Sequence, residues 1–265
     1  MSDGEFRGKV VLVTGGSSGI GRAAALAFAR EGANVVIASR GAEAGEAVVR
    51  EIEAASDASA LFVRTDVSNA EQVEALVRAA VARFGRLDCA FNNAASMEAG
   101  VFKPTAELSA EEFDRNIALN LRSVFLCLKH EITQLLAQGE GGAIVNTSSV
   151  NGLGGVARDA PYAAAKAGVL ALTKSAAQEY ATHGIRVNAL VAGAFRTPML
   201  ERAFAQASPL DPSAAESAFA GLVPLRRIGR PDEAAETVLW LCSDRASYVT
   251  GHSMIVDGGF TSFAR

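Results

Sequence analysis

The chain has 265 residues, of which 49% are hydrophobic and 20% are charged, and its formal net charge at pH 7 is −4. This composition excludes a disordered or collagen-like protein, and the length suffices for one α/β domain with a full core. A mildly acidic chain is a poor general ligand for nucleic acid or an anionic membrane, so we expect neither as a partner.

The cysteines and the N-terminus indicate where the protein works. Cys89, Cys127 and Cys242 lie far apart, and the sequence has no CxxC pair and no Cys/His cluster. We therefore expect free thiols and no metal site. The first apolar run, residues 10–13, is too short for a signal peptide, and no run approaches the ~18 apolar residues of a spanning helix. These features predict a cytoplasmic protein.

Short apolar runs alternate with helical periods along almost the whole chain. Ser109 and Glu112 form a capping box that opens a long helix, and Pro231 opens another. The alternation predicts right-handed βαβ units and a single doubly wound, Rossmann-type α/β domain over residues 1–265, with a seven-stranded parallel sheet flanked by helices. The predicted strands are residues 10–13, 35–38, 60–63, 87–91, 143–146, 186–190 and 253–256.

The segment 195–230, between the last two predicted strands, departs from this rhythm. It is too long for an ordinary connection and contains Pro198, Pro209, Pro212 and Pro224. An insertion at the carboxyl end of a sheet usually covers a ligand, so we expect a substrate lid. The alternative is a helical excursion with only a structural role.

A glycine-rich segment, 14–21 (TGGSSGIG), follows the first predicted strand and precedes a helix. Glycines let the backbone turn sharply and approach a diphosphate, and a helix N-terminus offers unpaired N–H groups. A tight strand-to-helix turn without a ligand is the alternative, but the position favours a dinucleotide site. Its expected members are Gly15, Ser17, Ser18, Gly19, Ile20 and Gly21.

The second predicted strand is followed by Ser39 and Arg40, about 20 residues past the glycines, where a dinucleotide fold meets the adenosine ribose. A carboxylate there would bind the 2′-hydroxyl and repel a 2′-phosphate. A hydroxyl followed by a guanidinium instead suits a phosphate monoester. We therefore expect NADP(H) as the preferred cofactor. Alternatively, Arg40 stacks on the adenine or lies in solvent, and NAD(H) is used.

Tyr162 and Lys166 lie four residues apart in a helical pattern, so their side chains share one helix face. A nearby ammonium stabilises a phenolate and lowers the tyrosine pKa from about 10 towards neutral pH. Such a tyrosine can protonate a carbonyl oxygen or deprotonate an alcohol. Ser149 follows the fifth predicted strand, at the edge where ligands bind in doubly wound sheets. Without the Tyr–Lys pair, Ser149 would be read as a turn residue.

Taken in chain order, these motifs resemble those of the short-chain dehydrogenase/reductase family. The resemblance covers nearly the whole chain and includes the turn beginning at Asn188 and the segment 249–259. The motifs that carry it are Thr14-Gly15-x-x-x-Gly19-x-Gly21, Asp66-Val67, Asn92-Asn93-Ala94, Asn120, Ser149 and Tyr162-x-x-x-Lys166.

The resemblance implies a role for each catalytic residue. Tyr162 would be the general acid/base, and Lys166 would lower its pKa and bind the nicotinamide ribose. Ser149 would hydrogen-bond the substrate oxygen. Asn120 would hold a water that joins Lys166 to solvent in a proton relay.

The resemblance also implies a cofactor site beyond the glycines. Asp66 and Val67 would contact the adenine, and Asn92 would lie by the adenosine ribose and steady the neighbouring strand. Thr197 and the backbone of residue 195 would contact the nicotinamide carboxamide. The remaining expected cofactor contacts are Asn93, Ala94, Ala95, Tyr162, Lys166, Gly193 and Phe195.

We therefore expect an oxidoreductase that reduces a ketone to a secondary alcohol with NADPH, or catalyses the reverse reaction. An NAD-dependent alcohol or sugar dehydrogenase of the same family is the alternative. A cofactor-binding scaffold without catalysis is a third possibility, but such a protein would be expected to lose Tyr162 or Lys166. Enoyl reductases of this fold usually separate the tyrosine and lysine by more than four residues.

The small-molecule substrate is expected to contact Ser149, Asn151, Tyr162, Met97 and Met199. Asn151 indicates a polar substituent on that molecule. Further expected walls are Ser96, Glu98, Val150, Leu153, Arg158, Phe195, Leu200 and Phe204, of which Glu98 and Arg158 are alternatively solvated loop charges.

Two residues depart from the family pattern: Ala95 stands where glycine is frequent, and Ala192 where proline is frequent. The resemblance also implies a homotetramer. One interface would use the long helices beginning near Ser109 and Pro161, and the other the helix from Pro231 with the last strand. The alternative is that the small and apolar residues of 163–177 and 254–263 pack only on the chain's own sheet.

Overall fold

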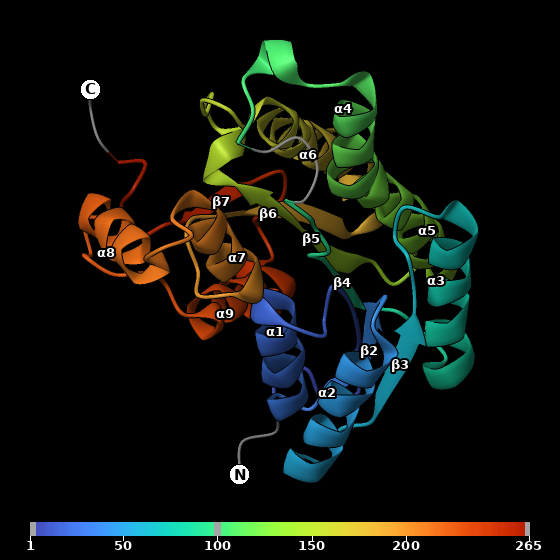
Figure 1. Ribbon diagram of the computed structural model, residues 1–265. Coiled ribbons are helices and arrows are strands. Elements are labelled where there is room, and N and C mark those ends of the chain that lie inside the picture. The colour runs from blue at the N-terminus through green and yellow to red at the C-terminus, as the bar shows by residue number, and fades with distance from the viewer. Residues whose placement is uncertain (1–3, 98–101, 263–265) are drawn as a thin grey trace.

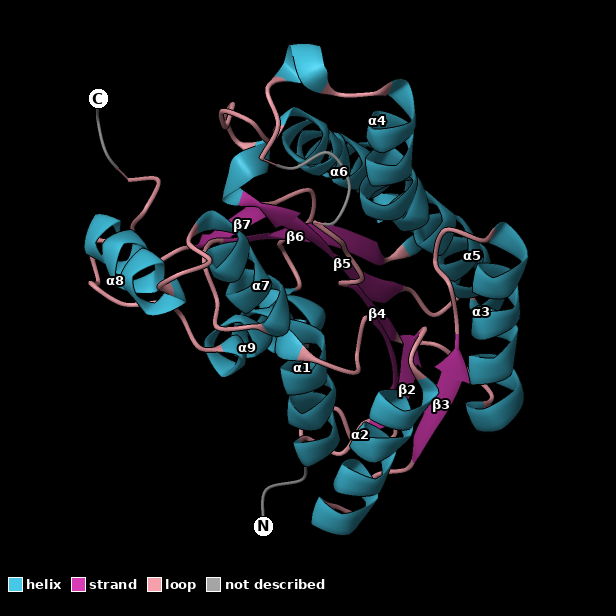
Figure 2. Cartoon of the chain, in the orientation of Figure 1, coloured by secondary structure: helices cyan, strands magenta, loops and turns pink. Residues whose placement is uncertain are grey.

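The seven predicted strands form one parallel sheet (Figure 2). The computed structural model describes residues 4–97 and 102–262. Its strands are β1 Val10–Thr14, β2 Asn34–Ser39, β3 Ala60–Arg64, β4 Cys89–Asn92, β5 Gly142–Ser149, β6 Ile185–Ala192 and β7 Ser253–Val256. They lie in the order β3-β2-β1-β4-β5-β6-β7, with Val11 of β1 paired to Val35 of β2 and to Cys89 of β4.

Nine α-helices connect the strands within the described residues. Helices α1, α2 and α9 pack on one face of the sheet, and α3, α5 and α6 pack on the other (Figure 1). The helices are α1 Gly19–Arg30, α2 Ala42–Ala55, α3 Ala70–Phe84, α4 Ala110–Ile117, α5 Ser123–Gln138, α6 Ala160–Tyr180, α7 Pro198–Ala207, α8 Pro212–Leu222 and α9 Pro231–Cys242.

The two helical layers explain why the strands read as continuous apolar runs. Along β1, Val11 and Val13 pack into the core under α1 and α9, while Val10 and Leu12 pack into the core under α3 and α5. All four are buried. Because successive side chains of a strand point to opposite faces, a sheet covered on both sides needs an apolar residue at every position.

The sheet order reverses between β1 and β4. The chain builds β1, β2 and β3 in one direction and then returns to place β4 on the other side of β1. In open α/β sheets, the loops that leave the two strands at such a point diverge and leave a crevice at the carboxyl ends. The glycine segment at the end of β1 and the Asn92-Asn93-Ala94 segment at the end of β4 therefore meet at this place.

The predicted long helix from Ser109 is interrupted. Its capping box forms: the Ser109 hydroxyl accepts from the Glu112 N–H, and the Glu112 carboxylate accepts from the Ser109 N–H. However, a π-helical turn, Ala118–Arg122, separates α4 from α5. Single π turns are rare and are frequent at functional sites, and this one carries Asn120.

The 195–230 segment folds as two helices, α7 and α8, and its end lies beside its start. A parallel bridge between Phe195 and Gly229 joins the two ends of the segment. Phe219 of α8 packs against Phe204 of α7, with ring centroids 6.0 Å apart, and stacks on Phe260 near the C-terminus at 5.5 Å. Of the helices described, none is long and apolar enough to cross a bilayer.

Candidate active site

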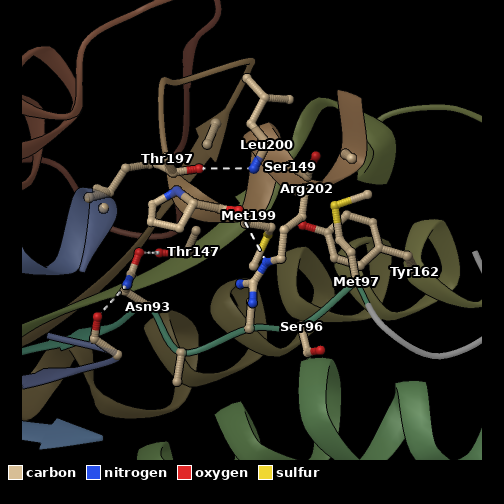
Figure 3. A pocket seen from close by; sticks show the side chains of 18 of the residues that line it. Asn93, Ser96, Met97, Thr147, Ser149, Tyr162, Thr197, Met199, Leu200 and Arg202 are labelled. Carbon is tan, nitrogen blue, oxygen red and sulfur yellow. Dashed lines mark hydrogen bonds between the residues drawn. The ribbon is translucent and has the colours of Figure 1, made fainter. Parts of the chain in front are cut away.

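A cleft of about 650 Å³ lies at the carboxyl ends of the strands, where the sheet order reverses. It runs from the tip of β2 to α7 of the 195–230 segment. Side chains from the loop after β4, from β5, from α6 and from α7 point into it (Figure 3). The predicted residues that line it are Gly15, Ser17, Ser18, Gly19, Ile20, Ser39, Arg40, Asp66, Val67, Asn93, Ala94, Ala95, Ser96, Met97, Ser149, Val150, Asn151, Arg158, Tyr162, Gly193, Phe195, Thr197, Met199, Leu200 and Phe204.

The glycine turn leaves no room for side chains. Gly15 has a left-handed backbone, with φ of 65°, which favours glycine. A Cβ on Gly21 would lie 2.3 Å from the Gly15 carbonyl oxygen and 2.7 Å from Nδ2 of Asn93. Gly21 does not line the cleft. Because it has no side chain, the first turn of α1 packs directly on the loop at Gly15, which does line the cleft.

The N-terminus of α1 fits a diphosphate. Ser18 occupies the N-cap position, yet its side chain makes no capping hydrogen bond, and the first turn of this fully described helix has no acidic residue. The first N–H groups of α1 thus keep their hydrogen-bonding capacity at the cleft wall, with the positive end of the helix dipole behind them. Ser17, Ser18, Gly19 and Ile20 are the residues that would hold the diphosphate of a dinucleotide.

The ribose end of the cleft carries a cation and a carboxylate. Arg40 is exposed, and the Ser39 hydroxyl donates to the Gly41 carbonyl oxygen at 3.2 Å. The Asp66 carboxylate accepts from the hydroxyl and the N–H of Ser68. The pKa of Asp66 is lowered, first by the Ser68 hydroxyl and also by the charge of Arg40. Asp66 is therefore ionised and close enough to Arg40 to sense its charge.

The chemical end brings Ser149, Tyr162 and Lys166 together. Lys166 is 1% exposed, its ammonium donates to the Thr147 carbonyl oxygen at 2.9 Å, and its Nζ lies 5.5 Å from the centroid of the Tyr162 ring. The Ser149 oxygen accepts from the Asn151 N–H at 3.2 Å. Helical spacing places the tyrosine and lysine on one face of α6, and β5 ends beside them.

Burial is the largest influence on the pKa values of Tyr162 and Lys166. It raises the pKa of Tyr162 well above the ordinary value of 10, and the Asp159 charge raises it further, while the Ser149 hydroxyl acts in the opposite direction. Burial also lowers the pKa of Lys166 to about 8. Burial is the largest cause of the raised Tyr162 pKa, and the lowering of that pKa by Lys166 stays a prediction. At neutral pH, Tyr162 is a phenol that can donate a proton.

The comparisons with known proteins agree with this geometry. Residues 15–261 match a family model described as Enoyl-(Acyl carrier protein) reductase. The chain is 47% identical over 262 residues, 99% of its length and 100% of the relative's, to 2,5-dichloro-2,5-cyclohexadiene-1,4-diol dehydrogenase of Sphingobium indicum. The chain belongs to the short-chain dehydrogenase/reductase family. It is therefore an NAD(P)-dependent oxidoreductase of alcohol and carbonyl groups.

Two solved structures of this family superpose on almost the whole chain. The crystal structure of levodione reductase matches with a TM-score of 0.94 and 43% identity, covering 98% of this chain and 100% of the other. A single-residue variant of actinorhodin polyketide ketoreductase with NADPH matches with a TM-score of 0.89 and 35% identity, covering 96% and 98%. The doubly wound fold predicted from the sequence is confirmed.

The environment of Asn120 in this short-chain dehydrogenase/reductase limits how it can hold a water. Its side-chain oxygen accepts from the Ser96 N–H at 3.0 Å, and its amide N–H groups face the Ser96 carbonyl and the backbone and side-chain oxygens of Asn116. The side chain is thus occupied in fastening the loop after β4 to the π turn. The water relay stays a prediction, and it would have to use the Asn120 backbone.

Asn92 does not lie where the resemblance implied. Its side chain is 2% exposed and donates to Glu131 at 2.9 Å and to the Asn146 side chain at 3.0 Å. It therefore faces the layer of α5 rather than the ribose end of the cleft. Its neighbour Asn93, the first residue after β4, lines the cleft instead. The expected contact of Asn92 with β5 is present through Asn146.

The substrate end of the cleft is mainly apolar. Met97, Met199 and Phe204 line it as predicted, but Leu153 does not, because the 3₁₀ turn Val150–Gly152 leaves it 43% exposed at the surface. Glu98 lies outside the described residues. Sequence reasoning missed Phe102, Leu119, Val156, Asp159, Arg202 and Phe219, which also line the cleft.

Of the missed residues, Asp159 had a sequence signal, since it lies one helical turn before Tyr162. Asn151 reaches the cleft, but its amide N–H donates to Asp159 at 2.7 Å. Ala95 and Ala192, the two departures from the family pattern, both line the cleft. Ala95 is not among the residues with positive φ, so its methyl group imposes no strain there. Within the described ranges, no cluster of His, Cys, Asp and Glu could hold a metal ion.

Proposed function

We propose that this protein interconverts a carbocyclic ketone and its secondary alcohol, with NADP(H) as the preferred cofactor. The observation that carries the proposal is the convergence of Ser149 and Tyr162 in one cleft with the glycine turn, with Lys166 buried beside the Tyr162 ring. The four-residue spacing of Tyr162 and Lys166 favours reduction of a carbonyl over reduction of an enoyl double bond, despite the description of the matching family model.

The chain's own residues supply the proton and its orientation. When bound, the dinucleotide supplies the hydride in reduction and accepts it in oxidation. Tyr162 donates its phenolic proton to the carbonyl oxygen. The Ser149 oxygen accepts from the Asn151 N–H, and the Ser149 hydroxyl, which hydrogen-bonds Tyr162, can donate to the same substrate oxygen. Lys166 uses one N–H on Thr147, which leaves two for the nicotinamide ribose.

The preference for NADP(H) rests on Ser39 and Arg40. Position 39 carries a hydroxyl rather than a carboxylate, and Arg40 is exposed at the rim of the cleft. A guanidinium contact with a phosphate monoester contributes roughly 1.5–3 kcal/mol, or about 10- to 150-fold in affinity. The ketoreductase structure with NADPH supports the same choice.

The cofactor experiment compares kcat/KM for NADPH and NADH. We expect NADPH to be favoured in the wild type and Arg40→Ala to raise KM for NADPH about 10- to 150-fold, with KM for NADH nearly unchanged. Ser39→Asp should lower the NADPH preference further, because its carboxylate repels the 2′-phosphate. A wild type that uses NADH more efficiently would overturn the assignment.

The carbocyclic substrate class rests on the cleft walls and one relative. Met97, Phe102, Met199 and Phe204 line the same cleft as Tyr162 and contribute apolar surface to it. The name of the Sphingobium indicum relative states a cyclohexadiene-1,4-diol as its substrate. A panel of cyclic ketones, open-chain ketones of equal carbon number and enoyl thioesters tests the proposal with NADPH. Turnover of open-chain ketones or enoyl thioesters above that of every cyclic ketone would contradict it.

We also propose a cytoplasmic homotetramer. Phe113 and Phe125 on α4 and α5 are 43% and 49% exposed, and Tyr248 and Ile255 near α9 and β7 are 102% and 45% exposed. Two such apolar regions suit two interfaces between copies. Light scattering should give about 110 kDa, four times the chain mass of 27.4 kDa. A mass near that of one chain at micromolar concentration would refute the assembly.

A further inference from the structure

Asp159, at the start of α6, is a buried acid that the proposed mechanism does not use. It is 6% exposed, and its Oδ1 has no hydrogen-bond partner among residues 4–97 and 102–262. Its Oδ2 accepts from the Asn151 side chain at 2.7 Å. Burial of an incompletely paired carboxylate opposes folding, so an ordinary capping role explains it poorly. The side chain of Asp159 makes no capping hydrogen bond with α6.

Asn151 connects this carboxylate to the catalytic serine. Its backbone N–H donates to the Ser149 oxygen at 3.2 Å, while its side chain donates to Asp159. The next residue, Gly152, packs so closely on α6 that a Cβ there would lie 2.7 Å from the carbonyl carbon of Lys166. The turn that follows Ser149 is thus pressed against α6 at Lys166 and fastened to the start of α6 at Asp159.

The backbone also turns sharply into this position. Arg158 has φ of 66°, a left-handed conformation that is unusual for a residue other than glycine and costs of order 1–3 kcal/mol. The turn ends at Asp159 and brings its carboxylate inward, one helical turn before Tyr162. Asp159, which fastens the Ser149 turn, is the N-cap residue of α6, and Tyr162 lies in the first turn of the same helix.

We propose that Asp159 is a positioning residue that fixes the Ser149 turn to the Tyr162 helix through Asn151 and places a negative charge near the tyrosine. This inference rests on the proposed function, in which Tyr162 donates the proton. The charge of Asp159 raises the pKa of Tyr162, after the larger effect of burial. Asp159 therefore helps to keep the phenol protonated, as reduction of a carbonyl requires.

Among the described residues of the cleft wall, Arg202 of α7 is exposed and donates to the Pro198 carbonyl oxygen. On α6 itself, Lys166 is the buried cation, and its pKa of about 8 makes it the second group that titrates here. Arg158 is exposed, and on β6 Arg186 donates to carbonyl oxygens of residues 241, 243 and 249. The charged residues of α4 and the π turn are not buried: Glu111, Glu112, Asp114, Arg115 and Arg122.

The test uses Asp159→Asn, which keeps the shape and can still accept from Asn151 but removes the charge. The readout is the pH profile of kcat/KM in both directions with NADPH or NADP. In reduction, the fall at alkaline pH should move to lower pH by roughly 0.5–1, because Tyr162 loses its proton more easily. In oxidation, the rise with pH should move in the same direction. Asp57→Asn, an exposed acid in the loop between α2 and β3, serves as the control with an unchanged profile.

A second variant, Asp159→Leu, removes both the charge and the bond to Asn151. We expect kcat to fall about 10- to 100-fold because Ser149 is misplaced, with the Kd for NADPH unchanged. Asn151→Ala keeps the acid but breaks the same link, so its kcat should also fall. This variant tests the positioning role even if Asp159→Leu does not fold. Asp159→Asn should restore most of the kcat that Asp159→Leu loses.

The outcomes separate this inference from the proposed function. If wild-type protein turns over no ketone or alcohol, the proposed function fails. If the wild type is active, an Asp159→Asn profile that coincides with the wild type overturns the role of the charge. Wild-type kcat in both Asp159→Leu and Asn151→Ala overturns the positioning role.

Discussion

Glu131 on α5 makes the stability of this protein depend on pH in an unusual direction. Its side chain is 1% exposed and accepts one hydrogen bond, from Nδ2 of Asn92 at 2.9 Å. Burial raises the pKa of this carboxyl from 4.5 to about 7, and the Asn92 bond only partly opposes it. In the unfolded chain the carboxyl has its ordinary pKa.

The magnitude follows from proton linkage. Because the folded pKa lies above the unfolded pKa, the folded state holds the proton more tightly. Its stabilising contribution is complete below about pH 4.5 and is lost as pH rises through about 7. The difference between the folded and unfolded pKa of Glu131 corresponds to about 3 kcal/mol of unfolding free energy. Glu131→Gln keeps an acceptor for Asn92 but removes the titration, so the variant should become the more stable protein at pH 8.

The assay is urea unfolding of wild type and Glu131→Gln at pH 5, 6, 7 and 8, at one fixed protein concentration because assembly contributes to stability. The free-energy difference between the two should grow in favour of the variant by about 2.5 kcal/mol from pH 5 to pH 8, because part of the effect is already present at pH 5. Glu46→Gln, an exposed acid on α2, is the matched control. A constant difference between wild type and Glu131→Gln across these pH values would refute the reasoning.

Two further predictions concern the cofactor site. Gly21→Ala should fold but lose at least about 100-fold in NADPH affinity, because its Cβ would lie 2.3 Å from the Gly15 carbonyl oxygen and must displace the glycine turn; an unchanged Kd in a fluorescence titration would contradict this. The pKa of Lys166 is about 8, so its ammonium is lost as pH rises through that value and NADPH affinity should fall between pH 7 and 9. Lys166→Ala should lower both turnover and affinity and abolish this pH dependence, and a variant that keeps it would show that another group is responsible.

The sheet and most of the cleft could be predicted from the sequence for one physical reason. Strands covered on both faces are apolar throughout, and parallel strands bring their carboxyl ends to a single edge. Residues as distant as Gly15, Ser39, Asn93, Ser149 and Thr197 therefore line one cleft.

The remaining differences depend on contacts that no spacing reveals. The π turn at Asn120 has no sequence signature of its own, since it replaces one helical hydrogen-bond pattern with another. The pKa of Tyr162 is set by burial, which depends on how tightly α6 packs on β5. The sequence places Asp159 one helical turn before Tyr162, but only the folded chain shows that its carboxylate accepts from the Asn151 side chain.

In the proposed mechanism, Tyr162 supplies the proton that accompanies hydride transfer at this cleft. Tyr162→Phe keeps the ring in place and removes only the hydroxyl, so the decisive measurement is its kcat with a cyclic ketone that the wild type reduces, at saturating NADPH. We expect a loss of about 10²- to 10⁴-fold, with an NADPH Kd within about threefold of the wild type. Turnover equal to that of the wild type would contradict the role of Tyr162.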